Sequence, residues 1–272
     1  MTGEGLELTS APLGAPEDDD WREAVVQRRL LPEPTGHKIV TPNDPEIRVL
    51  IGVPMERTIG QQAFFGFVQI FTQGWPVAKL EYTRNDIARC KFGEFLVNSS
   101  YTHLLMLDSD HVHHEFIVQR LARWFRAYPD EVRVCGGLNF RRGAPYDPCA
   151  FVDPGDGAFR RMAQWSRGAI EVDALGSGSM MIHRSVFEQL PHENGNPWFG
   201  YDYADVAGWP GTDMWFSRRC REAGIALWCD TTTVSPHVGD KLIDETTYRA
   251  WLQEHGVPEA RDGTEAPMEA AE

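Results

Sequence analysis

The sequence predicts an α/β fold with a mainly parallel central sheet flanked by helices, and three observations lead to this prediction. Short apolar runs alternate with segments whose apolar residues recur at helical spacing. Two of these runs, residues 47–54 and 103–107, are almost wholly apolar, as strands covered on both faces are. The 272 residues, 42% of them hydrophobic, are enough to bury a substantial core.

The first half of the chain alternates regularly between predicted strands and helices. We expect strands at 47–54, 77–82, 103–107 and 132–137, and helices at 60–72, 84–98 and 114–128. Helices of this length between strands indicate βαβ units, in which successive strands run parallel.

The second half is less regular. Residues 138–168 are rich in turn-forming residues and carry no clear element. After them we expect one or two strands within 169–182, a short helix at 184–190, an aromatic loop at 197–211, a helix at 212–223, a short strand at 225–229 and a loop at 236–239. Gly224 suits the position that closes a helix, which supports the end assigned to 212–223.

The formal net charge of −14 belongs mostly to the two ends of the chain. Residues 1–20 contain six acidic residues and no Lys or Arg, and residues 257–272 contain five acidic residues and one Arg. We therefore predict a flexible acidic arm at 1–45 and a disordered acidic tail at 257–272. The part between them is only mildly acidic, and the acidity of the chain argues against bulk electrostatic binding to nucleic acid.

Three features bear on localisation. No run approaches the roughly 18 to 20 apolar residues that a membrane helix needs, so we expect no membrane span. The N-terminal segment lacks the apolar core of a secretory signal. The five cysteines are scattered and form no C-x-x-C pair, which favours a reducing compartment over a disulfide framework or zinc cluster. A cytoplasmic location is predicted, and the oligomeric state stays open.

Two carboxylates follow the apolar run 103–107 directly. Asp108 and Asp110 share a side while the chain remains extended, because successive residues of a strand point to opposite faces. The carboxyl edge of an open α/β sheet is where ligands bind. Two hard oxygen ligands at this edge suit Mg²⁺ or Mn²⁺. The same residues would also fit a turn that caps the next helix.

The order of motifs along the chain resembles that of the GT-A glycosyltransferases, in particular the inverting family 2-like enzymes of bacterial or phage type. The matching segments are VLIGVPM (49–55), Thr83-Arg84-Asn85, LLMLDSD (104–110), GSGSMMIHRSVFEQL (176–190) and GTDMWFSRRCREAGIALWCD (211–230), followed by His237. The chain departs from the family pattern at Thr212, where a glutamate usually precedes the aspartate, and residues 138–168 have no counterpart.

The resemblance implies a single Rossmann-like GT-A domain at residues 46–256. Residues 46–137 would form the nucleotide-binding half and 138–256 the smaller acceptor half. The implied cofactors are Mn²⁺ or Mg²⁺ and a nucleoside-diphosphate sugar as donor, with a UDP-sugar as the first candidate. The acceptor is not readable, and glycans, lipid carriers, proteins, small molecules and hydroxymethylated DNA bases stay open.

The resemblance also implies a metal site. Asp110 would bind the ion directly, Asp108 would reach it through water or contact the ribose, and His237 would complete the site. An ordinary loop histidine is the alternative for His237. For the nearby histidines His111, His113 and His114, we expect helix-start or surface roles.

One catalytic residue and several donor contacts are implied as well. Asp213 would be the general base that takes the proton of the acceptor hydroxyl, although an acid at a helix start is also stabilised there without any catalytic role. The expected donor-binding residues, besides Asp108, are Pro54, Glu56, Arg84, Asn85, Gly176 and Gly178. For the glycines, the alternative is a bulge or turn.

Two other classes of function compete with this hypothesis. A metal-dependent phosphohydrolase or nuclease could use Asp108, Asp110 and the histidines, but the sequence offers no convincing further carboxylate cluster. A nucleotide-sugar-binding module with a decayed site would not be expected to keep Asp108, Asp110, Asp213 and His237 together. A retaining mechanism also stays open, because retaining enzymes share the fold. Positive charge gathers in the unmatched region, at Arg141, Arg142, Arg160, Arg161 and Arg167, as modified DNA would require.

Overall fold

The computed structural model describes residues 28–36, 38–55, 59–155, 159–193, 195–201, 211–239 and 241–256. A central eight-stranded sheet runs in the order β1-β8-β11-β5-β10-β4-β2-β3. These strands are β1 (Leu30–Leu31), β2 (Val49–Met55), β3 (Val77–Glu81), β4 (His103–Leu107), β5 (Val134–Leu138), β8 (Ala169–Val172), β10 (Ser179–His183) and β11 (Leu227–Val234). Only β8 and β10 run against the others, so the sheet is mainly parallel, as predicted.

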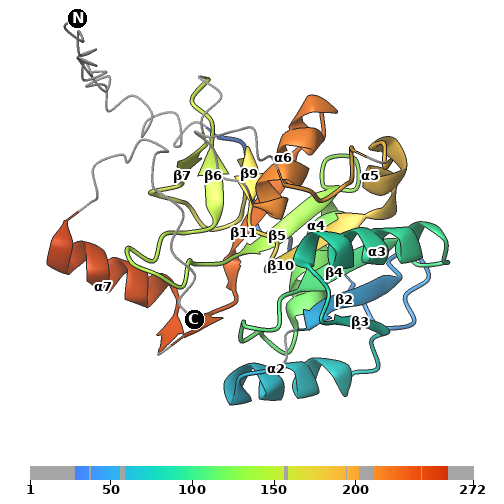
Figure 1. The fold of residues 1–272 in the computed structure, drawn as a ribbon, viewed down its shortest axis with the longest axis horizontal. Coiled ribbons are helices and arrows are strands. Elements are labelled where there is room, and N and C mark those ends of the chain that lie inside the picture. Colours follow the sequence, from blue (N-terminus) through green and yellow to red (C-terminus); the bar gives the residue numbers. More distant parts are fainter. Residues whose placement is uncertain are drawn as a thin grey trace, which may run out of the picture.

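Helices cover both faces of the sheet (Figure 1). Strand β4 shows how the chain divides its side chains, because Leu104 and Met106 pack into one core and Leu105 and Leu107 into the other. The first core also holds residues of α3 (Asn85–Val97), α5 (Arg184–Gln189) and α6 (Thr212–Glu222), and the second holds residues of α2 (Gln61–Phe71) and α4 (Ile117–Ala127). The polar residues that follow β4 therefore emerge at an edge enclosed by both layers.

The regular elements predicted for residues 47–137 are confirmed, with ends that differ by a few residues. The expected strand at 225–229 is longer and extends to Val234 as β11. Antiparallel β10 lies between β4 and β5, where Met181 pairs with Leu105 on one side and with Cys135 on the other. This insertion brings the glycine-rich start of β10 to the end of β4.

Small elements occur where the sequence predicted only turns or a loop. Within 138–168, β6 (Ala150–Val152) pairs with β7 (Arg160–Arg161). Strand β6 also pairs with β9 (Ala174–Leu175), which lies in the stretch 169–182 where one or two strands were predicted. Residues 236–239, expected as a loop, contain β12 (His237–Val238), which pairs with β13 (Leu242–Ile243). Helix α7 (Glu245–His255) follows and was not predicted.

The prediction of a flexible arm at 1–45 is wrong for the described residues from 28 onward. Strand β1 pairs with β8, and the side chains of Leu31 and Val40 are buried. The carboxylate of Asp44 accepts hydrogen bonds from the backbone amides of Glu46 and Ile47 and pairs with Arg126. Residues 28–36 and 38–45 thus belong to the folded domain, whereas 1–27 and the predicted tail 257–272 lie outside the described residues.

None of the helices in the described part of the chain combines the length and the apolar character that a bilayer-spanning helix needs.

Candidate metal centre

Two segments far apart in the sequence pair at the carboxyl end of β4. The amide of Val112 donates to the carbonyl of Pro236, and the amide of Val238 donates to the carbonyl of Asp110, both at 2.8 Å. These bonds place His111 opposite His237 in an antiparallel bridge. Backbone pairing, rather than side-chain attraction, therefore brings the two imidazoles together beside Asp110.

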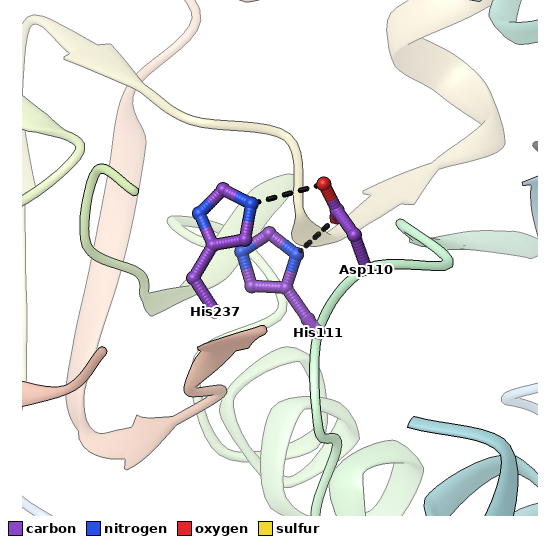
Figure 2. A group of neighbouring side chains, drawn as sticks. All are labelled: Asp110, His111 and His237. Carbon is purple, nitrogen blue, oxygen red and sulfur yellow. Dashed lines mark hydrogen bonds and ion pairs between the residues drawn. The ribbon is translucent and has the colours of Figure 1, made fainter. Parts of the chain in front are cut away.

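Asp110, His111 and His237 form a group whose possible ligand atoms all lie within 4.8 Å of one another. Figure 2 shows both imidazoles turned toward the Asp110 carboxylate. Asp110 Oδ1 is 2.8 Å from His111 Nδ1, and Oδ2 is 2.9 Å from His237 Nε2. The two rings stack with centroids 4.2 Å apart and a 17° angle between their planes. One carboxylate oxygen and two imidazole nitrogens are a donor set suited to a first-row divalent metal ion.

The tautomer of His237 supports this assignment. His237 Nδ1 lies 3.1 Å from the carbonyl oxygen of Phe140, which can only accept, so Nδ1 carries the proton. In a neutral ring, Nε2 then presents a lone pair to a carboxylate oxygen of Asp110. The lone pair of Nε2 and the carboxylate oxygen repel each other at 2.9 Å unless a proton or another cation lies between or beside them. An imidazole held by its other nitrogen in this way is a common arrangement for a metal ligand.

The carboxyl group of Asp110 is ionised. Burial alone would raise its pKa, but the interactions with the neighbouring His111 and His237 outweigh burial and hold the pKa well below its ordinary value. The site therefore offers a fixed negative charge to a cation.

His113 connects the two segments that carry the ligand group, because it contacts residues of both. Its Nε2 lies 3.0 Å from the carbonyl oxygen of Asp108, and its Nδ1 lies 3.0 Å from Ser235 Oγ. Burial lowers its pKa to about 4, which leaves the ring neutral at pH 7. The expected surface role is wrong for His111 and His113, which are 5% and 2% exposed.

Asp108 is held separately from this group. Its carboxylate accepts two hydrogen bonds from the buried guanidinium of Arg89, at 3.0 and 3.1 Å, and Arg89 also donates to Thr212 Oγ1. The Asp108 amide donates to the carbonyl of Gly178 at 3.0 Å. Arg89 therefore fixes the orientation of Asp108, and Asp108 is not part of the three-ligand group.

Asp213 lies in the first turn of α6, and its charge interacts with that of the same guanidinium. Burial raises the pKa of its carboxyl, while the charge of Arg89 and hydrogen bonds from backbone amides at the start of α6 oppose that shift. A Cβ atom added to Gly176 would lie 3.8 Å from Asp213 Oδ2. The charge of Arg89 thus acts on two of the predicted site aspartates, and Arg89 also hydrogen-bonds the first of them, Asp108.

The predicted donor-binding residues are spread around this edge. Gly178 lies beside His111 and Asn139, since an added Cβ would come within 3.0 Å of both side chains. Pro54 is buried in β2. Arg84 and Asn85 are exposed at the start of α3, where Arg84 bonds to Asp86 and lies over the ring of Tyr201. Glu56 lies outside the described residues.

Sequence reasoning missed four residues of this region: Arg89, His111, Asn139 and Arg142. Asn139 is 3% exposed, and its Oδ1 accepts from Ser179 Oγ at 3.1 Å, but its Nδ2 has no partner. Because Asn139 directly follows β5, its place at the same sheet edge as Asp108 was available from the strand prediction. Arg142 donates to Asp110 Oδ2 at 2.6 Å.

No family model matches the chain, and no curated protein matches its sequence. Among solved structures, A197 from STIV is similar with a TM-score of 0.51 and 17% identity, over 72% of this chain and 93% of A197. The fold is GT-A-like. This agrees with the fold predicted from the order of motifs.

Two further structures cover similar shares of the chain. GalNAc-T7 with UDP, GalNAc and Mn²⁺ has a TM-score of 0.46 and 10% identity, over 79% of this chain and 48% of that one. CMP:2-keto-3-deoxy-manno-octonic acid synthetase complexed with CTP has a TM-score of 0.42 and 13% identity, over 76% and 99%.

Proposed function

We propose that this protein is a metal-dependent glycosyltransferase that moves a sugar from a nucleoside-diphosphate sugar to an acceptor hydroxyl. One observation carries the proposal. On a GT-A-like fold, the group Asp110, His111 and His237 lies at the carboxyl edge of the sheet, where nucleotide ligands bind in open α/β proteins.

In this proposal, Asp110, His111 and His237 hold the ion. A divalent ion there neutralises the charge that develops on the departing diphosphate. Two imidazole nitrogens favour Mn²⁺ over Mg²⁺, which prefers oxygen ligands and keeps several waters. Asp108 does not belong to the ligand group, so a contact with the ribose, or with the ion through water, suits its arginine-held carboxylate.

Asp213 is proposed as the general base of an inverting reaction. Its raised pKa brings the carboxylate closer to the proton affinity that a base needs near neutral pH. The positive charge of Arg89 favours the ionised form of this carboxylate. Gly176 packs closely against Cys149, and Gly178 against His111 and Asn139, so any contact of these glycines with the donor sugar would be made by their backbone. Pro54, Glu56, Arg84 and Asn85 remain proposed contacts of the nucleotide.

Modified DNA is a less favoured acceptor than it was from the sequence. Arg142 pairs with Asp110, Arg161 with Asp147 and Arg167 with Glu33, so at least three of the arginines in 141–167 are engaged in ion pairs. These pairs reduce the positive charge that a phosphate backbone would require.

The test is donor hydrolysis or transfer in a panel of nucleotide sugars. The full-length protein is incubated with each sugar and Mn²⁺, and released nucleoside diphosphate is measured with and without a chelator. We expect release that depends on the metal and on one or a few donors. If no donor yields nucleoside diphosphate and the protein instead hydrolyses phosphate esters, the phosphohydrolase alternative replaces this proposal.

A further inference from the structure

Arg142 places a second cation directly on the candidate metal ligands. Its Nη2 lies 2.6 Å from Asp110 Oδ2 and 3.3 Å from His237 Nε2, while 55% of the side chain is exposed. These are the same two atoms that face each other within the metal group.

The backbone around Arg142 fixes where this side chain starts. The amide of Arg141 donates to the carbonyl of Asp147, and the amide of Cys149 donates to the carbonyl of Asn139, which closes a loop after β5. The stem of Arg142 runs over Gly239, since a Cβ added there would lie 3.3 Å from Arg142 Cγ. The side chain is about half exposed, and its terminal guanidinium is held by Asp110.

An ion bound by Asp110 and His237 would compete with Arg142 for the lone pairs of Oδ2. A guanidinium and a divalent ion also repel each other at such short range unless negative charge lies between them. A diphosphate supplies that charge, and its oxygens match the fork of N–H donors that arginine presents.

We propose that Arg142 is the exchangeable cation of the donor site. In the metal-free protein it neutralises Asp110, and when the ion and the diphosphate bind, it transfers its hydrogen bonds to phosphate oxygens. This inference rests on the proposed function and adds the residue that couples metal binding to donor binding.

The consequence is a reciprocal coupling. An ion that binds alone must displace Arg142 and leave the guanidinium without a carboxylate partner. An ion that binds with the diphosphate gives Arg142 a new anionic partner. Each ligand therefore strengthens the other by the same factor.

Calorimetry on the full-length protein and on Arg142→Gln tests this. Mn²⁺ is titrated alone, and UDP or inorganic diphosphate is then titrated at saturating Mn²⁺. We expect Arg142→Gln to bind Mn²⁺ alone about two- to fivefold more tightly, which matches the loss of an exposed ion pair. It should bind UDP and diphosphate about ten- to a hundredfold more weakly, as the loss of hydrogen bonds to a charged group predicts.

Arg167→Gln is the matched control. It removes the same charge from an 84% exposed side chain that lies 3.8 Å from Glu33, and it should change neither affinity. If Arg142→Gln weakens Mn²⁺ and UDP together, Arg142 only supports the site and the inference is wrong. It is equally wrong if UDP affinity is unchanged.

The outcomes also separate this inference from the proposed function. A wild-type protein that binds Mn²⁺ but neither UDP nor diphosphate overturns both, because no donor phosphate then exists for Arg142. A wild-type protein that binds all three probes, with an Arg142→Gln variant that matches it, overturns the inference alone.

Discussion

Asp110 is the residue on which the most interactions of the site converge. Its carboxylate accepts from Arg142 and lies within hydrogen-bond distance of His111 Nδ1 and His237 Nε2. Asp110→Asn keeps the shape of the side chain but removes its charge, so we expect Mn²⁺ affinity to fall by more than about a hundredfold, beyond the usual effect of residues that merely support a ligand. Calorimetry with Mn²⁺ measures this. Asp108→Asn is the control and should retain most of the affinity, because Asp108 lies outside the ligand group.

Asp213 carries the second prediction at this scale. Asp213→Asn cannot accept a proton, so transfer should fall by roughly 10²- to 10⁴-fold while Mn²⁺-dependent UDP binding survives. Because burial raises the pKa of Asp213, wild-type transfer should decline as pH falls through a value above the ordinary 3.8. Near-normal turnover in Asp213→Asn would exclude the base role and favour a retaining mechanism.

His103 lies apart from the site. Its lowered pKa leads us to predict that the free energy of unfolding depends on pH. Burial and the neighbouring His183 lower its pKa to about 3, compared with 6.5 for the unfolded chain. Protons then bind the unfolded state more strongly, so the stability that depends on neutral His103 is complete above pH 6.5 and is lost as pH falls toward 3.

The expected loss for His103 is up to about 1.4 kcal/mol per pH unit within that window. The free energy of unfolding in urea at pH 7.5 and pH 5 measures it. His103→Gln has no such proton to bind, so its pH dependence should be weaker than that of the wild type. Equal slopes in the two proteins would contradict the assignment to His103.

At the scale of elements, strand β1 gives the sharpest test, because the sequence predicted an arm there. Leu31 is 8% exposed and Leu30 is 44% exposed in the same strand. Leu31→Ala should lower the free energy of unfolding by about 2 kcal/mol or more, as core truncations do, whereas Leu30→Ala should cost less than about 1 kcal/mol. Urea unfolding measures both variants. Two equal, negligible effects would show that the N-terminal segment does not contribute to stability.

The elements that the sequence predicted well are those with a strong local pattern. Strand β4 has five consecutive buried residues, which follows directly from its apolar run. Helix α7 was missed because Tyr248 is its one fully buried residue, so almost no apolar periodicity marks it. Its Asp244 cap, which accepts from the Thr247 amide at 3.0 Å, was the available signal.

The site was harder to predict, because it depends on pairing between distant segments. Asp110 and His237 were expected to meet, but the role of His111 follows only from its bridge to His237. The pattern of residues 108–114 gives no means of telling which of three histidines will face the carboxylate. Likewise, Arg89 lies on the buried side of α3, and its partner Thr212 is 123 residues away.

At the scale of the whole molecule, the number of possible metal-binding groups helps to distinguish a glycosyltransferase from a two-metal phosphohydrolase. Within the described part of the chain, Asp110, His111 and His237 are the one group of three side chains that could hold an ion. A two-metal phosphohydrolase would need a second ligand set about 4 Å away. The single proposed ion site at the sheet edge, with Asp213 on the neighbouring helix, is the arrangement that the proposed sugar transfer requires.

The central claim is that a divalent ion binds at Asp110, His111 and His237 together with the donor diphosphate. Anomalous diffraction at the manganese edge from crystals grown with Mn²⁺ and UDP tests it most directly. We expect one strong peak within about 2.0–2.3 Å of a carboxylate oxygen of Asp110 and of one nitrogen each of His111 and His237, with phosphate oxygens completing the coordination. A peak bound by Asp108 without the histidines, or UDP bound with no peak at this site, would contradict the account.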